Sequence, residues 1–268
     1  MRAKTTAESN KALIRATYAR AWQGDFTVFE GHPCLWQTRQ VFSLLLAGFH
    51  PVSDLAAQTI AEDAFVFHYT ATQLLHHGPA FGVAPTGKQV VSVNCSLDEV
   101  QGDAIVQHNG ASDWTTVLRA IGAPFAAGWP APPQPAALPI GTPDMSAGAA
   151  KAVVADLLIA LLRGDPAAQH PGASDLRQEF AAIGTAFPDA ALTVVRQIVE
   201  GDLVGTRATL AGTHRGPLHG IAPTGRAVSW DLFFLNQVAG GRVVDHRGTI
   251  GWIDVLCKIG VLPPPGAR

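Results

Sequence analysis

The fold is decided by the stretch His76-His77-Gly78-Pro79-Ala80-Phe81-Gly82-Val83-Ala84-Pro85-Thr86-Gly87-Lys88. The same pattern returns as His214-Arg215-Gly216-Pro217-Leu218-His219-Gly220-Ile221-Ala222-Pro223-Thr224-Gly225-Arg226. Eight of the thirteen positions are identical, and the offset between the copies is 214 − 76 = 138. Similarity at a fixed spacing indicates a repeated structural unit. The sequence therefore predicts one module written twice.

The offset of 138 holds, without a gap, along most of the chain. It pairs His32-Pro33 with His170-Pro171, Arg39-Gln40 with Arg177-Gln178, Phe49 with Phe187, Glu62 with Glu200, His108 with His246, Gly110 with Gly248, Trp114 with Trp252, and Ile121-Gly122 with Ile259-Gly260. The repeat thus covers whole modules and is not confined to one loop.

One segment of the repeated stretch partly matches the sequence motif of a phosphate-binding loop. Gly82 to Lys88 fits the first seven places of G-x-x-x-x-G-K-[ST], but Gln89 follows where Ser or Thr would bind the metal. The next residues, Val90 to Val93, are typical of a strand, whereas a phosphate-binding loop opens a helix. Pro-Thr-Gly instead favours a tight turn between two strands.

Composition places the chain among ordinary globular proteins. Its 268 residues suit two domains of about 130 residues, each large enough to bury a core. With 19 Lys and Arg against 21 Asp and Glu, the net charge is −2. Basic residues form no cluster, which argues against nucleic-acid binding. We therefore expect no nucleic-acid partner.

The sequence also points away from membranes and from export. No apolar run reaches the ~18 residues that a membrane span requires, and residues 1–10 lack the apolar core of a secretory signal. The three cysteines, Cys34, Cys95 and Cys257, are odd in number and widely spaced. Reduced thiols in the cytoplasm are therefore expected.

Periodicity predicts the same order of elements in both copies. Apolar spacing of about 3.6 residues predicts helices, and β-branched runs between turn residues predict strands. The expected helices are 8–23, 34–47 and 115–121 in the first copy, and 150–162, 173–186 and 254–259 in the second. The expected strands are 55–62, 64–76, 89–100 and 104–114, and then 192–199, 203–214, 227–238 and 242–252.

These elements predict an α+β fold with three parts. Residues 1–122 form the first module and 149–268 the second, each with helices packed on one face of a curved antiparallel sheet. Residues 123–148, which hold seven prolines, form a semi-rigid linker without a core of its own. Because a duplicated module supplies both partners of a two-fold interface, we expect an intramolecular pseudo-dimer, which could pair further.

The order of motifs resembles the SnoaL-like polyketide cyclase family of the NTF2-like superfamily. The second copy is the more similar, through Ala186-Phe187-Pro188-Asp189, Glu200-Gly201-Asp202, Gly212-Thr213-His214-Arg215-Gly216 and Pro223-Thr224-Gly225-Arg226. The resemblance implies cone-shaped α+β modules, each with an apolar cavity. It also implies aldol-type ring closure on a polyketide-like carbonyl compound, without a metal, a nucleotide or any other cofactor.

The resemblance further implies a catalytic aspartate at the end of the last strand. Asp113 holds that place in the first copy, nine residues before Gly122, whereas the second copy has Gly251 there. The segments between the first two helices, 26–31 and 166–169, are shorter than the family's, so either cavity could be shallow. Any catalysis is therefore expected in the first module.

Several further side chains are candidates for the site. His76 or His108 would polarise a carbonyl oxygen beside Asp113, a carboxylate whose alternative role is to cap the following helix. The alternative role of the histidines is to hold the bend or to pack in the core. Candidate substrate contacts are His68, Trp114, His214, His246 and Trp252. No metal-binding spacing of His and Cys is present.

Two functions follow from this reading. The first is a cofactor-independent cyclase or isomerase that acts on a small apolar carbonyl compound by general acid–base chemistry. The second is a catalytically silent protein that binds a small molecule or only keeps the fold, which Gly251 and the short front segments favour.

Overall fold

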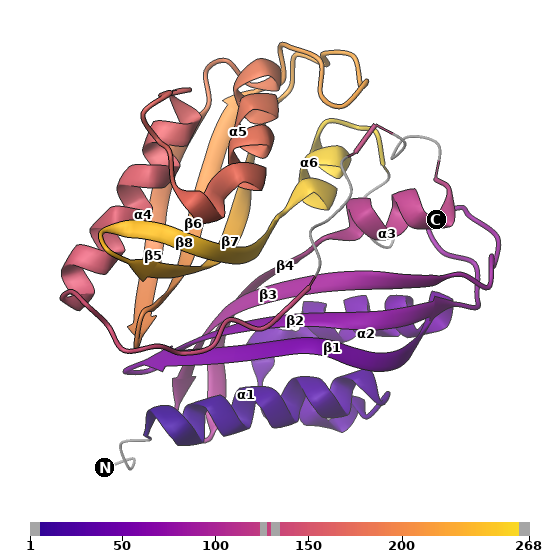
Figure 1. Ribbon diagram of the computed structural model, residues 1–268. Coiled ribbons are helices and arrows are strands. Elements are labelled where there is room, and N and C mark those ends of the chain that lie inside the picture. The colour runs from indigo at the N-terminus through magenta and orange to yellow at the C-terminus, as the bar shows by residue number, and fades with distance from the viewer. Residues whose placement is uncertain (1–5, 124–127, 130–134, 263–268) are drawn as a thin grey trace. The chain divides into compact units, whose positions relative to one another are not determined.

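The computed structural model describes residues 6–123, 128–129 and 135–262. The chain divides into two compact units, Met1–Ala127 with Pro135–Ala137, and Gly128–Gln134 with Leu138–Arg268. Each unit holds helices and one four-stranded antiparallel sheet, in the order β1-β2-β3-β4 and β5-β6-β7-β8 (Figure 1). The prediction of two α+β modules is confirmed.

The first unit begins with four helical segments, continues as a meander of four strands and ends with a short helix. Its elements are α1 (Ala7–Trp22), η1 (Phe26–Phe29), η2 (Pro33–Leu35), α2 (Trp36–Gly48), β1 (Phe49–Glu62), β2 (Phe65–His76), β3 (Gln89–Gln101), β4 (Ala104–Ser112) and α3 (Trp114–Ile121). Thr6 begins α1 in a capping box with Ser9, which satisfies backbone N–H groups of the first turn.

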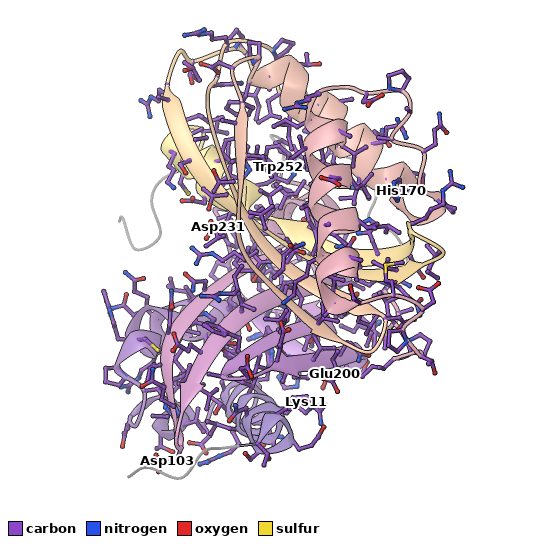
Figure 2. All side chains as sticks on the ribbon, turned by 90° about the vertical axis from the view of Figure 1, so that its left-hand side faces the viewer. Lys11, Asp103, His170, Glu200, Asp231 and Trp252 are labelled. Atoms are coloured by element: carbon purple, nitrogen blue, oxygen red, sulfur yellow. The ribbon has the colours of Figure 1, made fainter. Side chains whose placement is uncertain are left out.

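The second unit repeats this order. Its elements are α4 (Ala147–Leu162), η4 (Pro171–Ala173), α5 (Ser174–Ala186), β5 (Ala191–Glu200), β6 (Leu203–Thr213), β7 (Ala227–Ala239), β8 (Arg242–Ile250) and α6 (Trp252–Lys258). Figure 2 labels Glu200 at the end of β5, Asp231 on β7 and Trp252 at the start of α6. Asp231 accepts hydrogen bonds from Arg207 at 2.8 Å and from Thr209 at 2.7 Å, tying β7 to β6.

The first strand is longer than expected. β1 begins at Phe49 and not at residue 55, and Phe49 pairs with His76. Register shifts between Pro51 and Ser53 and between Asp54 and Ala56 break the alternation of apolar and polar residues. A strand with bulges loses the period of two on which sequence prediction depends.

The duplicated stretch forms the same bend in both units. Gly78 and Gly216 each donate a backbone N–H to the end of the preceding helix, to Gly48 and Ala186. A Cβ on either glycine would collide with a helix carbonyl oxygen, so only glycine fits there. Gly87 has φ +67° and leads directly into β3, so the structure places a turn between strands where a phosphate-binding loop would open a helix.

Part of the expected linker packs against the second unit. Leu138 is 1% exposed, and the Gly141 N–H donates to Asp202 at 2.6 Å. Asp144 accepts from the Gly240 N–H at 2.6 Å. These residues therefore have fixed contacts of their own, which the proline content of the segment did not indicate.

Candidate functional site

The helix-facing side of the first sheet changes from apolar to polar along its strands. At the end nearest the hairpin turns, a core of buried residues closes the unit: Ile14, Tyr18, Ala21, Phe29, Leu35, Phe42, Ala61, Val66, Val100 and Ile105. Beyond this core, β3 presents Asp98, Ser96 and Asn94 on one face, because alternate residues of a strand point the same way. Polar groups therefore line the interior of this module.

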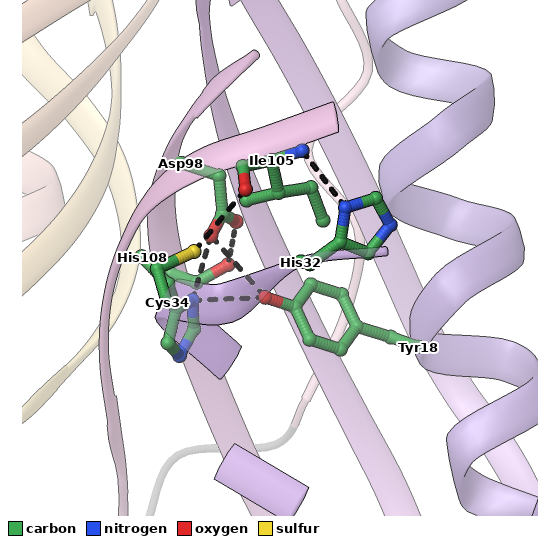
Figure 3. Close-up of polar contacts among 7 residues, drawn as sticks. Tyr18, His32, Cys34, Asp98, Ile105 and His108 are labelled. Atoms are coloured by element: carbon green, nitrogen blue, oxygen red, sulfur yellow. Dashed lines mark hydrogen bonds and ion pairs between the residues drawn. The ribbon is translucent and has the colours of Figure 1, made fainter. Parts of the chain in front are cut away.

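A buried carboxylate lies at the base of this polar strip and contacts a histidine. Asp98 is 0% exposed and pairs in register with His108 of β4. The Asp98 Oδ1 and His108 Nδ1 atoms are 2.6 Å apart (Figure 3). Because the carboxylate accepts, we assign the imidazole proton to Nδ1, which leaves the lone pair on Nε2. His108 is thus oriented as a base.

Two hydroxyl groups complete the surroundings of Asp98. The Tyr18 hydroxyl, from α1, lies 3.2 Å from Asp98 Oδ1 and 2.9 Å from His108 Nδ1, and Figure 3 shows it pointing at both groups. The Ser96 hydroxyl donates to Asp98 Oδ2 at 2.7 Å. Burial, together with the charge of Asp98, raises the pKa of Tyr18 well above its ordinary value. Tyr18 therefore remains a hydrogen-bond donor.

The free nitrogen of His108 is directed along β4. A Cβ built on Gly110 would lie 3.2 Å from His108 Cε1 and 3.3 Å from Nε2, so the ring leans over this glycine. On the same face, the pair that follows Gly110 and Ser96 is Ser112 and Asn94. The Ser112 hydroxyl donates a hydrogen bond to Asn94 Oδ1 at 2.6 Å. The Asn94 Nδ2 atom is shielded from solvent and has no partner among the described residues. An amide donor and an imidazole base thus share one face.

His68 lies beside this group as a neutral ring. It stacks on Tyr18 with ring centroids 5.8 Å apart, and its Nδ1 is 2.9 Å from the Thr59 hydroxyl. Burial lowers the pKa of His68 from its usual 6.5 to about 4, although the Asp98 charge acts in the opposite direction. The residue predicted as a substrate contact therefore packs against the catalytic candidates.

This burial predicts a stability that depends on pH. Below pH 6.5 the unfolded chain protonates His68 while the folded chain does not, so the free energy of unfolding falls with decreasing pH. His68→Gln should remove about 1.5 kcal/mol of this decrease between pH 6.5 and 5. Urea denaturation of both proteins at the two pH values measures the effect, and parallel pH profiles would contradict it.

Asp113 is not part of the hydrogen-bonded group around Asp98 and His108. It is the N-cap residue of α3. Its Oδ1 accepts from the Thr116 N–H at 3.1 Å and from the Thr115 hydroxyl at 2.8 Å. Its Oδ2 accepts from the Thr116 hydroxyl at 2.5 Å. Both oxygens are therefore used at the start of α3. A catalytic role for Asp113 stays a prediction.

His76 and His214 perform the same local task in the two units. Each Nδ1 accepts a backbone N–H at 3.3 Å, from Thr86 and from Thr224. Both side chains are 0% exposed, and burial lowers the pKa of each. The geometry supports the reading that these rings hold the bend.

The predicted tryptophans are buried at the start of the last helix of each unit. Trp114 is 5% exposed and packs on Phe49, with ring centroids 5.6 Å apart. Trp252 is 4% exposed, and its Nε1 donates to Glu179 at 3.3 Å. Gly251 precedes α6 and offers no side-chain cap. The structure therefore places both tryptophans in packing positions.

The second unit lacks the network of the first. At the offset of 138, Asp98 is replaced by Asn236 and Ser96 by Phe234. The first helices are offset by 140, as the Gly-Asp pairs after them show, so Tyr18 is replaced by the buried Leu158. His246 remains opposite Asn236 in the sheet, but no hydrogen bond joins the two side chains among the described residues. The two modules therefore differ in their interior chemistry.

Tyr18, Ser96 and Asp98 were not predicted as site residues. One indication was present, because Ser92, Asn94, Ser96 and Asp98 occupy every second position of an expected strand. Such spacing places polar groups on one face of a strand. Only the fold shows that this face is covered by α1.

The described part of the chain holds neither a cluster of metal-binding side chains nor a helix that could span a membrane. No group of three or more His, Cys, Asp or Glu side chains there could hold a metal ion. Within the same residues, no helix has the length and apolar content to cross a membrane.

Comparison with known proteins places a match in the second unit. Residues 149–256 match the model of the family described as SnoaL-like polyketide cyclase. No curated protein matches the chain. Similar solved structures include AclR of Streptomyces galilaeus, with 28% identity, a TM-score of 0.39, and coverage of 44% of this chain and 85% of AclR.

Two other structures show the same extent of similarity. TsrD of Streptomyces laurentii has 22% identity and a TM-score of 0.39, and covers 44% of this chain and 100% of its own. IdmH of Streptomyces antibioticus has 23% identity and a TM-score of 0.38, and covers 41% of this chain and 98% of its own.

Proposed function

We propose that the first module, which repeats the pattern of the second unit whose residues 149–256 match the SnoaL-like polyketide cyclase model, performs cofactor-independent acid–base chemistry on a small, largely apolar carbonyl compound. The observation that supports this proposal is the 2.6 Å contact between the fully buried Asp98 carboxylate and the largely buried ring of His108. A carboxylate that fixes one ring nitrogen leaves the other free to take a proton.

The proposed reaction begins with removal of a proton from the carbon next to the carbonyl group. His108 Nε2 takes this proton and becomes an imidazolium, which the Asp98 carboxylate stabilises. The electron pair of the broken C–H bond moves into the enolate, and Asn94 Nδ2 donates a hydrogen bond to its oxygen. Preorganised donors of this kind stabilise the charge that develops in the transition state.

The enolate can react in two ways, and in each of them the imidazolium of His108 returns its proton to the substrate. In an isomerisation, the imidazolium protonates a different atom of the conjugated system. In a ring closure, the enolate carbon attacks a second carbonyl carbon of the same molecule, and the imidazolium protonates the new alkoxide. Either outcome restores neutral His108 and needs no oxidant, reductant or bound metal.

The supporting side chains keep this base in one orientation. Tyr18 and Ser96 donate to the two oxygens of Asp98, so the carboxylate remains a pure acceptor toward His108. The neutral ring of His68 fills the space beside Tyr18 without adding a competing charge. We therefore assign Tyr18, Ser96 and His68 a positioning role.

A second candidate function is ligand binding without turnover. It is favoured by the contacts of Asp113, because the aspartate that the family resemblance implies as the catalytic group has both oxygens engaged by the α3 cap. In that case the polar strip would hold a carbonyl ligand, and His108 would serve only as an acceptor.

Exchange of α-protons separates these functions without knowledge of the natural substrate. The full chain is incubated with phenylacetone in D₂O, and loss of the α-proton signals is followed by NMR. Acceleration over the buffer rate supports acid–base chemistry. Exchange at the buffer rate, for phenylacetone and for the more acidic benzoylacetone, would leave only binding.

The same assay tests which side chain is the base. Asp113→Asn preserves the helix cap, because Asn is as good an N-cap residue as Asp. This variant should therefore keep its exchange rate within about twofold, a difference well below the effect of removing a base. A loss of about 10²-fold or more would instead make Asp113 the base.

A further inference from the structure

The exposed side of α2 carries an apolar stripe, formed by Trp36, Val41 and Leu44. Trp36 is 58% exposed, Leu44 57% and Val41 41%. Trp36, Gln40 and Leu44 are spaced by four residues, so they follow one another along one face of the helix, and Val41 lies beside Leu44. Single exposed apolar residues are common, but a group on one helix face indicates a surface for association.

The equivalent helix of the second unit has no such stripe. At the offset of 138, the corresponding residues of α5 are small or charged: Ser174, Glu179 and Ala182. The repeated fold therefore does not require large apolar residues at these places. The stripe of the first unit is explained by a contact outside the module.

An exposed aromatic ring stands at the C-terminal end of α2. The stretch 80–83 is a tight turn, whose end residues pair through backbone hydrogen bonds of 2.9 and 3.0 Å. Gly48, the last residue of α2, comes into close contact with Ala80 of this turn. Phe81 at the tip is 44% exposed and packs on Trp114, with ring centroids 5.6 Å apart.

The backbone of this turn is unfavourable for phenylalanine. Phe81 has φ +51°, and the next residue, Gly82, has φ +77°. A two-residue turn with positive φ at both central positions prefers Asn-Gly or Gly-Gly, because a bulky side chain is strained there. Strain of this kind suggests that the side chain serves a contact beyond the turn itself.

The second unit shows what covers the same place. Phe81 corresponds there to His219, which also has a positive φ, and the last helix again begins with a tryptophan, Trp252. Trp129, from the segment between the modules, lies 4.4 Å from the His219 ring and 6.0 Å from the Trp252 ring, centroid to centroid. It is 4% exposed. The turn and the last helix thus form an aromatic socket that holds an indole in the second unit.

The stripe and the socket of the first unit complement each other in a symmetric pair of chains. α2 has 13 residues and is about 20 Å long. When two such helices pack side by side in opposite directions, the N-terminus of each meets the C-terminus of the other. Helical side chains lean toward the N-terminus, so Trp36 extends past its own helix toward Phe81 of the other copy. Leu44 and Val41 then lie in the middle of the contact.

We propose that the chain forms a homodimer through its first module, in which the α2 helices of two copies pack antiparallel and each Trp36 enters the socket formed by Phe81 and Trp114 of the other copy. The contact is isologous, with Gln40 of both copies at the two-fold axis. A specific contact buries about 800 Å² on each partner, which a helix of this length and the adjacent turn can supply. The pairing does not depend on the reaction proposed for the first module.

Sedimentation velocity of the full chain, from low to high micromolar concentration, tests this pairing. Wild type should show a concentration-dependent equilibrium between monomer and dimer. Trp36→Glu should raise the dimer Kd by at least about tenfold, because it removes a buried aromatic anchor. An acidic residue in the first turn of a helix is favourable, so the fold should persist. Val195→Glu, at a residue 46% exposed in the second unit, is the control and should leave the Kd unchanged.

Phe81→Asn separates the contact from the fold. This change supplies the Asn-Gly pair that the turn prefers, so the free energy of unfolding should not fall. The dimer Kd should nevertheless rise by at least about tenfold, since the socket loses an aromatic wall. Urea denaturation, at a concentration where the chain is monomeric, measures the first quantity, and sedimentation measures the second.

A disulfide tests the antiparallel arrangement. Gln40→Cys places one thiol of each copy at the axis, close enough to bond, so mild oxidation should give a covalent dimer. Gln178→Cys makes the equivalent change on the exposed face of α5 and should not cross-link.

Three outcomes would overturn the proposal. The first is a chain that stays monomeric: a Trp36 fluorescence that acrylamide cannot quench would then place another part of the same chain on the stripe, and a quenchable one would leave the stripe to a different protein. The second is a dimer whose Kd is the same in wild type, Trp36→Glu and Phe81→Asn. The third is a dimer in which Gln40→Cys does not cross-link.

Discussion

His108→Gln is expected to lower the rate of α-proton exchange by about 10³-fold, the effect typical of removing a general base. Glutamine retains a polar side chain that can bind Asp98, but it has no nitrogen lone pair able to take a proton. The fold should therefore persist while the chemistry is lost. NMR of phenylacetone in D₂O measures the rate, and circular dichroism checks the fold.

Asp98→Asn should also reduce the rate of α-proton exchange, by at least about 10²-fold, because it changes the tautomer of the base without removing it. The new amide can donate to His108 Nδ1, which favours the tautomer with its proton on Nε2 and so leaves no lone pair there. His50→Gln changes an exposed histidine of β1 and serves as the matched control. Exchange that is equal in all four proteins would contradict the assignment of His108.

Gly216→Ala is expected to destabilise the second unit by about 3 kcal/mol, at the upper end of the range for overpacking. The added Cβ would collide with the backbone carbonyl oxygen of Thr185 near the end of α5, and backbone cannot move aside as a side chain can. The turn that follows β6 would have to leave its contact with the helix. Urea denaturation of the full chain measures the loss.

Gly184→Ala is expected to give the opposite result at the residue next to Thr185. Gly184 lies inside α5, and a Cβ there would meet nothing within 4 Å. Alanine is favoured over glycine in a helix interior, so this variant should be more stable by about 1 kcal/mol. Destabilisation of similar size in both variants would show that the close contact at Gly216 is not the cause.

The sequence was sufficient for most of the architecture. The offset of 138 predicted two equal modules, and turn residues separated the strands correctly because glycine marks the positions with positive φ, such as Gly87 and Gly225. The start of β1 was missed, since two register shifts remove the alternation that identifies a strand. Local patterns predict regular segments and fail at bulges.

The site was only partly predictable, and the reason is long-range geometry. His108 was named from the repeat, but its partners come from α1 and β3, 90 and 10 residues away in sequence. Tyr18 appeared as an ordinary core residue of an amphipathic helix. Asp98 appeared as one polar residue among several. Their convergence depends on how α1 crosses the sheet, which no local pattern encodes.

The two modules share the contacts that fix their backbone and differ in the polar side chains of their interiors. The histidines of the bend bind backbone in the same way in both units, at 3.3 Å from Thr86 and from Thr224. The interior pair, by contrast, is an acid–base pair in the first unit and an amide with a neutral imidazole in the second. The interior histidine is thus shared by both copies, and the residue opposite it, Asp98 or Asn236, makes the difference between them.

The central claim is that Asp98 holds His108 with its proton on Nδ1 and its lone pair on Nε2. Long-range ¹H–¹⁵N NMR of the full chain labelled with ¹⁵N-histidine observes this directly at pH 7.5, with His108→Gln providing the assignment. We expect a protonated Nδ1 and an unprotonated Nε2 for His108. A ring protonated on Nε2, with Nδ1 accepting a hydrogen bond from Tyr18, would contradict it.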